Sequence, residues 1–432
     1  DIKLAKAVLE DITGQGITGY RAPSFSISTA NPWAHDCIAD AGYVYSTGDA
    51  GKASAPGFPV APGAANIPGN NTFSGVVSGL LSGSRLGFRG EEALGNGLKA
   101  IFTLEYSLNI DDNSGVGNTT SGLQARQQFV GLSGGFGAIT LGRQYAPGYQ
   151  ATANNDPAAG AVFEPQSYLS AQAGNTITPN SGARWNNSIA YTTPNWGGFT
   201  GKLIYAFGET NNQDAITPSG AVPAGTYNDK VVSWEDNGRY GIGANYANGP
   251  FNIDFVWQTR QNVIANPAPL ITSGLLAPTA IPAPANAAGK DINEAYLGGS
   301  FDFKVVKIMA SYQQQNDKNP INNDNTVWQV GGIVPVGNGN IHLGYASLEM
   351  DQGRVKAPYA PVNAKKLNGN SDAWMIAYTH SLSKRTTLYT GYVWTENDNN
   401  SFAAGPISNA TSLVGAKGQD NQTFLAGVRH TF

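Results

Sequence analysis

Hydrophobic and polar residues alternate with a period of two in many segments from about residue 82 onward. Within 251–258, for example, Phe251, Ile253, Phe255 and Trp257 alternate with mostly polar residues. The same alternation recurs in the segments 341–346 and 424–432. Because successive side chains of a β-strand point to opposite faces, each segment is predicted to be a strand with one apolar face and one face of small or polar groups.

The connections between these segments alternate in length. Short connections are expected at Gly134–Gly137, Pro194–Gly198, Asn248–Pro250, Asp302–Lys304, Val336–Gly339 and Ser381–Arg385. Long connections are expected at 46–82, 109–124, 145–186, 208–237, 261–290, 350–371 and 397–421. Short turns at one end and long loops at the other are typical of an up-and-down transmembrane barrel. Counting between the connections gives about sixteen antiparallel strands, enough to enclose an aqueous channel.

The composition favours a barrel in a membrane over a soluble β-sandwich. Charged residues make up 13% of the chain, about half the share usual for a soluble domain. The longest uncharged, fairly apolar stretch, Ala265–Ala288, contains five prolines and is not a membrane-spanning helix. A closed barrel is the other way to pair every backbone group in lipid. Strand-end aromatic residues suited to a membrane interface are Tyr106, Tyr145, Trp196, Tyr205, Trp257, Tyr312, Trp394 and Phe432.

Catalytic and metal-site patterns are missing from the sequence. Cys37 is the only cysteine, and the net charge of −4 does not suggest nucleic acid as a partner. The four histidines, His35, His342, His380 and His430, have no metal-ligand spacing. We therefore expect no enzyme activity, no metal and no cofactor. A barrel hydrolase with a Ser–His pair on the lipid face is the remaining enzymatic alternative.

Several separated motifs resemble the general porins of Gram-negative bacteria. They are Ser82–Ala100, Gln128–Gly137, Thr140–Tyr145, Leu382–Thr386 and the terminal Phe432, and the resemblance covers about residues 37–432. It implies an all-β, 16-stranded barrel in the outer membrane, a homotrimer surrounded by outer-membrane lipid, with a third loop folded inward. It also implies an assembly signal at Phe432 and a pore for small hydrophilic solutes and ions.

The same resemblance implies a pore constriction with a basic wall. The matching arginines are Arg85, Arg89, Arg126, Arg143 and Arg184. The alternation of side chains along the strand independently supports a lumen-facing position for Arg85 and Arg89, because Leu86 and Phe88 point to the opposite, lipid-facing side. On the next strand, parity turns Lys99, Thr103 and Glu105 toward water, with Glu105 within reach of the arginine row. The alternative to a pore role is a structural one, in which each arginine forms an ion pair with a neighbouring carboxylate and stiffens the barrel wall.

An acidic wall is expected on the inward loop, Ala146–Asn186, which carries Asp156 and Glu164. Opposed charged walls would set up a transverse field that admits dipolar solutes and excludes apolar ones. Five arginines against Glu105 and the two loop acids predict a mild preference for anions. The two acids could instead be ordinary solvated loop residues, and a substrate-specific channel of the same shape is the alternative function.

The N-terminal segment does not follow the porin pattern. Residues 1–46 resemble a fragment of a NodB-type polysaccharide deacetylase, with Arg21 and Pro23 in its Arg-Ala-Pro-Ser-Phe motif. That family's metal-binding Asp and paired histidines are absent, and about forty residues cannot bury a core, so we expect no activity. Strand one is expected near 38–46, within a barrel of residues 36–432. Residues 1–35 would be a periplasmic or plug-like appendage, or the product of gene fusion or a faulty gene prediction.

Overall fold

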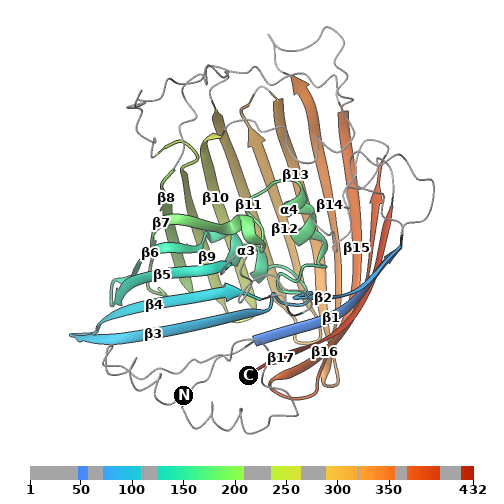
Figure 1. The fold of residues 1–432 in the computed structure, drawn as a ribbon, viewed down its shortest axis with the longest axis horizontal. Helices are drawn as coiled ribbons and strands as arrows, with labels where there is room; N and C mark the ends of the chain where they lie inside the picture. The colour runs from blue at the N-terminus through green and yellow to red at the C-terminus, as the bar shows by residue number, and fades with distance from the viewer. Residues whose placement is uncertain are drawn as a thin grey trace, which may run out of the picture.

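The described part of the chain is dominated by antiparallel β-strands (Figure 1). The computed structural model describes residues 47–56, 72–108, 110, 124–208, 235–263, 289–319, 321–355, 367–398 and 420–432. The strands are β1 Thr47–Pro56, β2 Thr72–Ser78, β3 Arg85–Gly95, β4 Leu98–Ser107, β5 Ala125–Gly134, β6 Gly137–Tyr145, β7 Arg184–Thr192, β8 Phe199–Ala206, β9 Arg239–Asn248, β10 Phe251–Val263, β11 Lys290–Asp302, β12 Lys307–Asp317, β13 Ile321–Val336, β14 Gly339–Val355, β15 Leu367–Ser381, β16 Thr386–Asn397 and β17 Asn421–Thr431.

Backbone pairing runs once around the sheet and returns to its start. Each strand from β3 to β16 pairs with the next one in the chain, and β17 pairs with β1. On its other side β1 pairs with both β2 and β3, at Ala50↔Ser78 and Thr47↔Arg85. β2 and β3 are therefore two parts of one crossing, separated by residues 79–84. The expected 16-stranded antiparallel barrel is confirmed.

Side chains alternate between an apolar outer face and an inner face that is largely polar. On β11, Glu294 and Tyr296 are buried inside, whereas Leu297, the next residue along the strand, is 51% exposed. Most exposed large hydrophobic residues of the described strands belong to this outer band. Such a surface suits hydrocarbon rather than water, and side chains of the opposite parity face the interior. No helix within the described ranges is long and apolar enough to span a bilayer.

The start of the barrel differs from the sequence prediction. The range 46–82 was expected to be a loop, but it contains β1 and β2. The expected first strand near 38–46 lies outside the described residues, and the strand that pairs with β17 is β1. The register of this pairing places Thr47 opposite Thr431 and Ser54 opposite Phe424.

The third long connection packs inside the barrel, as expected for the inward loop. It contains the helices α3 (Pro147–Asn154) and α4 (Pro165–Gln172) and the 3₁₀ turn η1 (Ser181–Ala183), all drawn within the barrel in Figure 1. Leu80, in the interruption between β2 and β3, belongs to the apolar cluster under this loop. The carbonyl oxygen of Leu80 also accepts a hydrogen bond of 3.1 Å from the Val162 amide. The segment 79–84 between β2 and β3 thus helps to hold the inward loop in place.

Replacing Leu297 by arginine tests the lipid-facing assignment. The L297R variant should lose about 2–4 kcal/mol of unfolding free energy in phospholipid bilayers, because an outward arginine must enter hydrocarbon. Urea unfolding followed by tryptophan fluorescence in vesicles measures the loss. L297A is the control for lost size without added charge; equal stability of L297R and L297A would contradict an outward position in lipid.

Candidate functional site

A buried ion-pair cluster joins the inner faces of β3, β4 and β5. Glu105 is 1% exposed, and its Oε1 accepts a 2.8 Å hydrogen bond from Arg126 Nε. Arg85 Nη1 lies 3.8 Å from Glu105 Oε2, while its Nε and Nη2 donate to Gly83 and Ser82 in the interruption of the strand. The expected proximity of Glu105 to the arginine row is therefore present. The Glu105 carboxylate thus interacts with the guanidinium groups of both Arg126 and Arg85.

A bulge brings Arg126 into this cluster. Val130 and Leu132 on β5 are exposed on the outer face, and simple alternation would also turn Arg126 outward. The register shifts between β4 and β5, where Glu105 pairs with Gln127 but Tyr106 pairs with Ala125. The extra residue is Arg126, whose side chain bonds to Glu105 inside the barrel. Bulges redirect side chains in this way.

Arg143 and Arg184 lie at the neighbouring ends of β6 and β7. Arg143 Nε donates to the Ala125 carbonyl at 2.9 Å and its Nη1 to the Arg184 carbonyl at 3.1 Å. The Arg184 guanidinium lies 5.4 and 5.5 Å from the ring centroids of Tyr145 and Tyr149, which stack on each other 3.7 Å apart. The Tyr145 hydroxyl also accepts a hydrogen bond from Arg126. Tyr145 thus belongs to the basic wall, not to the lipid interface where sequence reasoning put it.

Arg89 lies apart from this cluster. It pairs in register with Thr103, whose side chain is buried inside, so its strand position is on the inner face. Four residues separate it from Arg85, about 13 Å along a strand, toward the short connection at Asn96–Gly97. Its side chain is exposed. The arginine row therefore extends toward the short-turn end of the barrel.

The two acids of the inward loop are buried rather than open to the lumen. Asp156 is 3% exposed and Glu164 is not exposed at all. Asp156 Oδ2 accepts from the Gly160 amide at 2.9 Å, and Glu164 caps α4 by accepting from the Ser167 amide at 2.9 Å. Glu164 Oε1 has no hydrogen-bond partner within the described residues. These carboxyl groups hold the loop and do not form the open acidic wall that was expected.

Burial changes the protonation of this acidic pair. It raises the pKa of Asp156 to about 7. Burial also raises the pKa of Glu164 well above its usual value, and the nearby Asp156 carboxylate raises it further. In this dry site both carboxyl groups therefore favour the neutral, protonated form.

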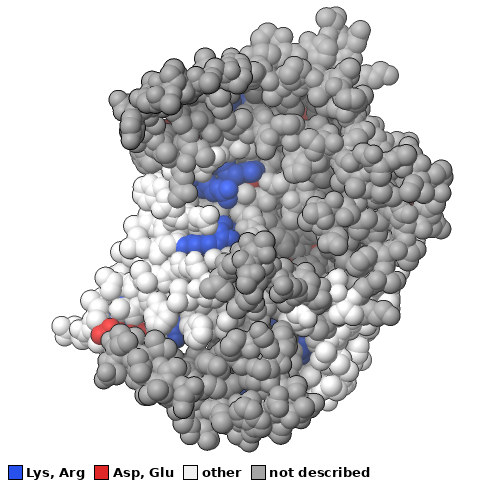
Figure 2. Space-filling view, in the orientation of Figure 1, with Lys and Arg blue, Asp and Glu red and all other residues white. Residues whose placement is uncertain are grey.

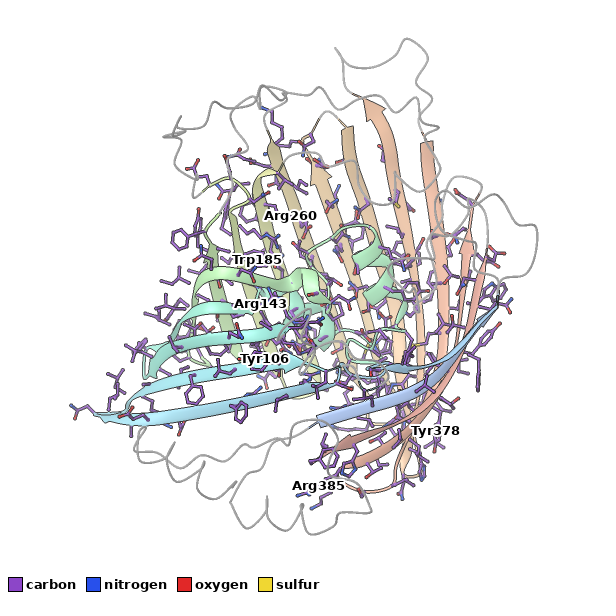
Figure 3. All side chains as sticks on the ribbon, in the orientation of Figure 1. Tyr106, Arg143, Trp185, Arg260, Tyr378 and Arg385 are labelled. Carbon is purple, nitrogen blue, oxygen red and sulfur yellow. The ribbon has the colours of Figure 1, made fainter. Side chains whose placement is uncertain are left out.

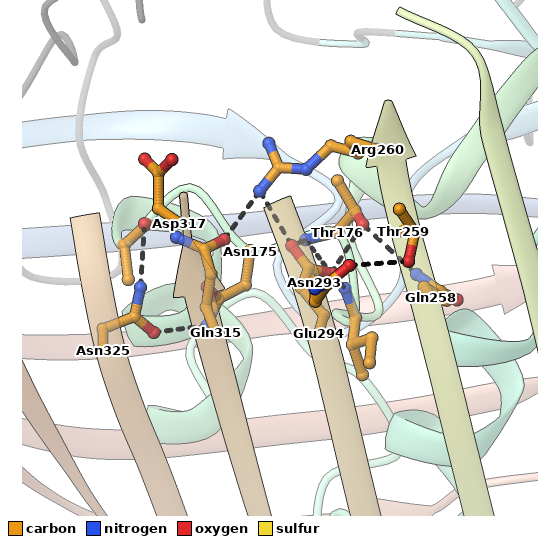
Figure 4. Close-up of polar contacts among 12 residues, drawn as sticks. Asn175, Thr176, Gln258, Thr259, Arg260, Asn293, Glu294, Gln315, Asp317 and Asn325 are labelled. Carbon is orange, nitrogen blue, oxygen red and sulfur yellow. Dashed lines mark hydrogen bonds and ion pairs between the residues drawn. The ribbon is translucent and has the colours of Figure 1, made fainter. Parts of the chain in front are cut away.

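Further basic residues on the inner wall were missed by the sequence reasoning. Arg239 on β9 and Arg260 on β10 are direct neighbours in register, and the alternation of β10 already places Arg260 opposite in parity to Phe255 and Trp257. Arg260 Nη2 bonds to Glu294 at 2.9 Å and to Gln315 at 2.6 Å (Figure 4). Lys202 on β8 donates to the Tyr145 carbonyl.

These basic groups gather on one side of the barrel. In the view of Figure 3, Arg143, Trp185 and Arg260 lie one above another, on β6, β7 and β10 of the continuous stretch from β6 to β10. Figure 2 shows lysine and arginine atoms in two clusters in the same region of the visible face. A closed sheet with an apolar exterior, a polar interior and a charged wall beside an inward loop defines a transmembrane channel of the porin class.

Comparison with known proteins identifies the family. A sequence model of the Gram-negative porins matches residues 36–400, and the chain belongs to this family. Outer membrane porin protein 32 of Delftia acidovorans is 29% identical over 84% of this chain and 88% of that protein. An outer membrane porin protein of Bordetella pertussis is 28% identical over 74% and 78% of the two chains. These similarities place the protein in the outer membrane as a diffusion channel for small hydrophilic solutes.

A solved structure supports the same assignment. The anion-selective porin from Comamonas acidovorans superimposes with a TM-score of 0.65 at 26% identity, over 90% of this chain and 98% of that one. The family match begins at residue 36, and residues 1–46, with their resemblance to a deacetylase fragment, lie outside the described part of the chain. The porin assignment therefore concerns the barrel and not the N-terminal segment.

The buried acidic pair predicts a pH dependence of loop docking. The docked loop holds the Asp156 proton up to about pH 7, whereas an undocked Asp releases it near its usual value of 3.8. A raised acid pKa means that docking is strongest at low pH and weakens as the pH rises from about 4 to 7. Hydrogen exchange of peptides from 147–180, corrected for intrinsic rates, should show less protection at pH 8 than at pH 5.

The control is the double variant D156N/E164Q, which has no acid at the pair. Its loop should be equally protected at both pH values. Protection in the unmodified protein that increases with pH would contradict the raised pKa values of the docked pair.

Proposed function

We propose that the wall carrying Arg85, Arg89, Arg126, Arg143 and Arg184, with Glu105 among them, is the pore constriction and gives this porin a mild preference for anions. The observation that carries the proposal is the charge balance: Glu105 is one carboxylate, and it is already shared by two arginines. Lumen ions that pass this wall meet a net positive field, and rings of like charge set ion preference in channels.

The inward loop supports the proposal by narrowing the lumen beside this wall. Its helix α3 begins directly after β6, and Tyr149 in that helix stacks on Tyr145 at the wall. The rings of Tyr145 and Tyr149 also lie against Arg184. Aromatic faces hold a guanidinium without neutralising it, so Arg184 keeps its full charge. Asp156 and Glu164 serve, in this proposal, to fix the loop in position rather than to attract cations.

The relatives agree with an anion preference. The structurally similar porin of Comamonas acidovorans is described as anion-selective. We extend that property to this chain because its own basic wall has the required charge. A general diffusion role fits the constriction, since its described groups are charged and aromatic.

Three further parts of the proposal concern assembly, catalysis and the N-terminus. We propose a homotrimer, on family grounds, with Phe432 as part of the assembly signal at the end of the last strand. We propose that the protein acts only as a channel, with no cofactor. Residues 36–432 would form the barrel, and residues 1–35, the deacetylase-like fragment, would be a non-catalytic appendage. Light scattering of the detergent-solubilised protein tests the trimer; a monomeric mass would overturn it.

Replacing single charges at the wall tests the constriction. In planar bilayers, the zero-current potential in a KCl gradient should show anion selectivity for the unmodified protein. R126Q should lower the chloride-to-potassium permeability ratio about fivefold, since a unit charge about 4 Å from an ion is worth about 1 kcal/mol in water. E105Q should raise the ratio, because it removes the carboxylate that offsets Arg85 and Arg126.

Two matched variants control for charge changes elsewhere. E92Q and R385Q alter exposed groups near the short-turn end of the barrel, and both should leave the ratio close to that of the unmodified protein. E105Q should also unfold more readily, by about 3–5 kcal/mol, since it leaves buried arginine charge unpaired. Cation selectivity in the unmodified protein, or an unchanged ratio in both R126Q and E105Q, would refute the proposed constriction.

A further inference from the structure

Two arginines lie side by side on the inner wall, apart from the constriction residues named above. Arg239 and Arg260 are directly opposite each other in the pairing of β9 and β10. Outward side chains such as Ile242 and Phe255 have the opposite parity, so both arginines face the interior. Directly opposed side chains on one face are about 5 Å apart at their Cβ atoms. Two like charges at that spacing repel each other unless an anion lies between them.

The protein supplies little negative charge to this pair. Glu294 is the nearest acid, and Arg260 Nη2 bonds to it at 2.9 Å. The Glu294 carboxylate also accepts from the Thr176 amide, the Thr176 hydroxyl and the Ile177 amide at 2.6–3.0 Å (Figure 4). Its lone pairs are thus used to hold the inward loop. Asp236, just before β9, is bound by Asn262.

Donors without acceptors surround the pair. No acceptor among the described residues bonds to the Arg239 guanidinium, which is only partly buried. Arg260 Nε and the indole Nε1 of Trp185 are buried and have no hydrogen-bond partner within the described chain. The Trp185 ring lies against Gly241 of β9, two residues from Arg239. Unpaired buried donors cost free energy, and Arg260 Nε and Trp185 Nε1 are two such donors at this stretch of wall.

Placement in the pore gives this stretch a role in transport. Arg239 is the first residue of β9 and Arg260 is near the end of β10. Both therefore lie close to the long connections, at the end that faces outside the cell in such barrels. Figure 3 places Arg260 nearer that end than Arg143. A solute entering from outside would meet Arg239 and Arg260 before the constriction.

We propose that Arg239 and Arg260 form a binding site for a small divalent oxyanion of the phosphate class, which is occupied before the anion reaches the constriction. Planar guanidinium groups donate pairs of parallel hydrogen bonds to oxyanions and discriminate them from chloride, which has no such geometry. Arg260 is fixed in place by Glu294 and Gln315, so its remaining donors are preorganised. The proposal deepens the anion preference proposed above but rests on different residues.

Conductance in phosphate tests the site. Single-channel conductance of the full-length protein in planar bilayers should saturate with increasing sodium phosphate at pH 8, where the divalent form dominates, and rise almost linearly in sodium chloride. R239Q should raise the half-saturating phosphate concentration about tenfold, the effect of losing one strong hydrogen-bonded charge. R239K, which keeps the charge but loses the paired donors, should give an intermediate shift.

R239Q is the chosen variant because no carboxylate of the described chain bonds to Arg239. Removing the Arg239 guanidinium therefore leaves no described carboxylate without its partner. R385Q is the matched control, expected to leave phosphate saturation unchanged. Heat-modified mobility on gels confirms that each variant folds. Linear phosphate conductance in the unmodified protein, or equal half-saturation in R239Q, would overturn the site. The two proposals separate cleanly: failure of the constriction appears as an unchanged chloride-to-potassium ratio in R126Q, whereas failure of this site appears only in phosphate saturation.

Discussion

The closure of the sheet, in which β1 pairs with β17 on one side and with β2 and β3 on the other, is the constraint on which the rest of this structure depends. In hydrocarbon an unpaired backbone N–H or C=O costs several kcal/mol, so a sheet that spans a membrane must close on itself. Closure fixes which face of each strand is outside. Leu297 and Phe255 then belong to lipid, and Glu294 and Arg260 belong to the interior. The polar interior is a consequence of the closed fold. The inward loop must pack against these polar side chains, and the pore is lined by them.

The inward loop fits this interior through polar contacts as much as through apolar ones. Gly148 donates to Gln258, Asn155 to Asp254 and Asn175 to Asn325, all at 2.8–3.0 Å. The loop thus replaces the water that would otherwise solvate the wall side chains on β10, β11, β12 and β13. On this side of the barrel the loop bonds to wall side chains such as Gln258, Asp254 and Asn325. The opposite stretch, from β3 to β9, contains most of the arginines and keeps charges that the loop does not neutralise.

The sequence correctly predicted the features that follow from the alternation of side chains along a strand and from the lengths of the connections. Alternation correctly placed Glu105 on the inner face, and connection length correctly marked a long connection at 145–186, whose inward folding was implied by the family resemblance. It could not place the first strand, because β1 has little alternation and its position is fixed by the register with β17. It could not foresee the bulge that turns Arg126 inward, since bulges depend on the register of two strands. The position of Arg126 came from family resemblance instead.

The misjudged acids show why charge in a sequence does not translate directly into charge in a pore. Asp156 and Glu164 are in a long loop, where acids are usually solvated, yet the loop folds inward and removes both from water. A count of charged residues would place two acids in the open lumen that the structure buries. Arg239 and Arg260 show the converse, because the alternation of β9 and β10 keeps both charges on the inner wall. The charge that faces the lumen therefore cannot be read from the overall charge of −4, because it is set by which groups the closed sheet and its loop leave facing water.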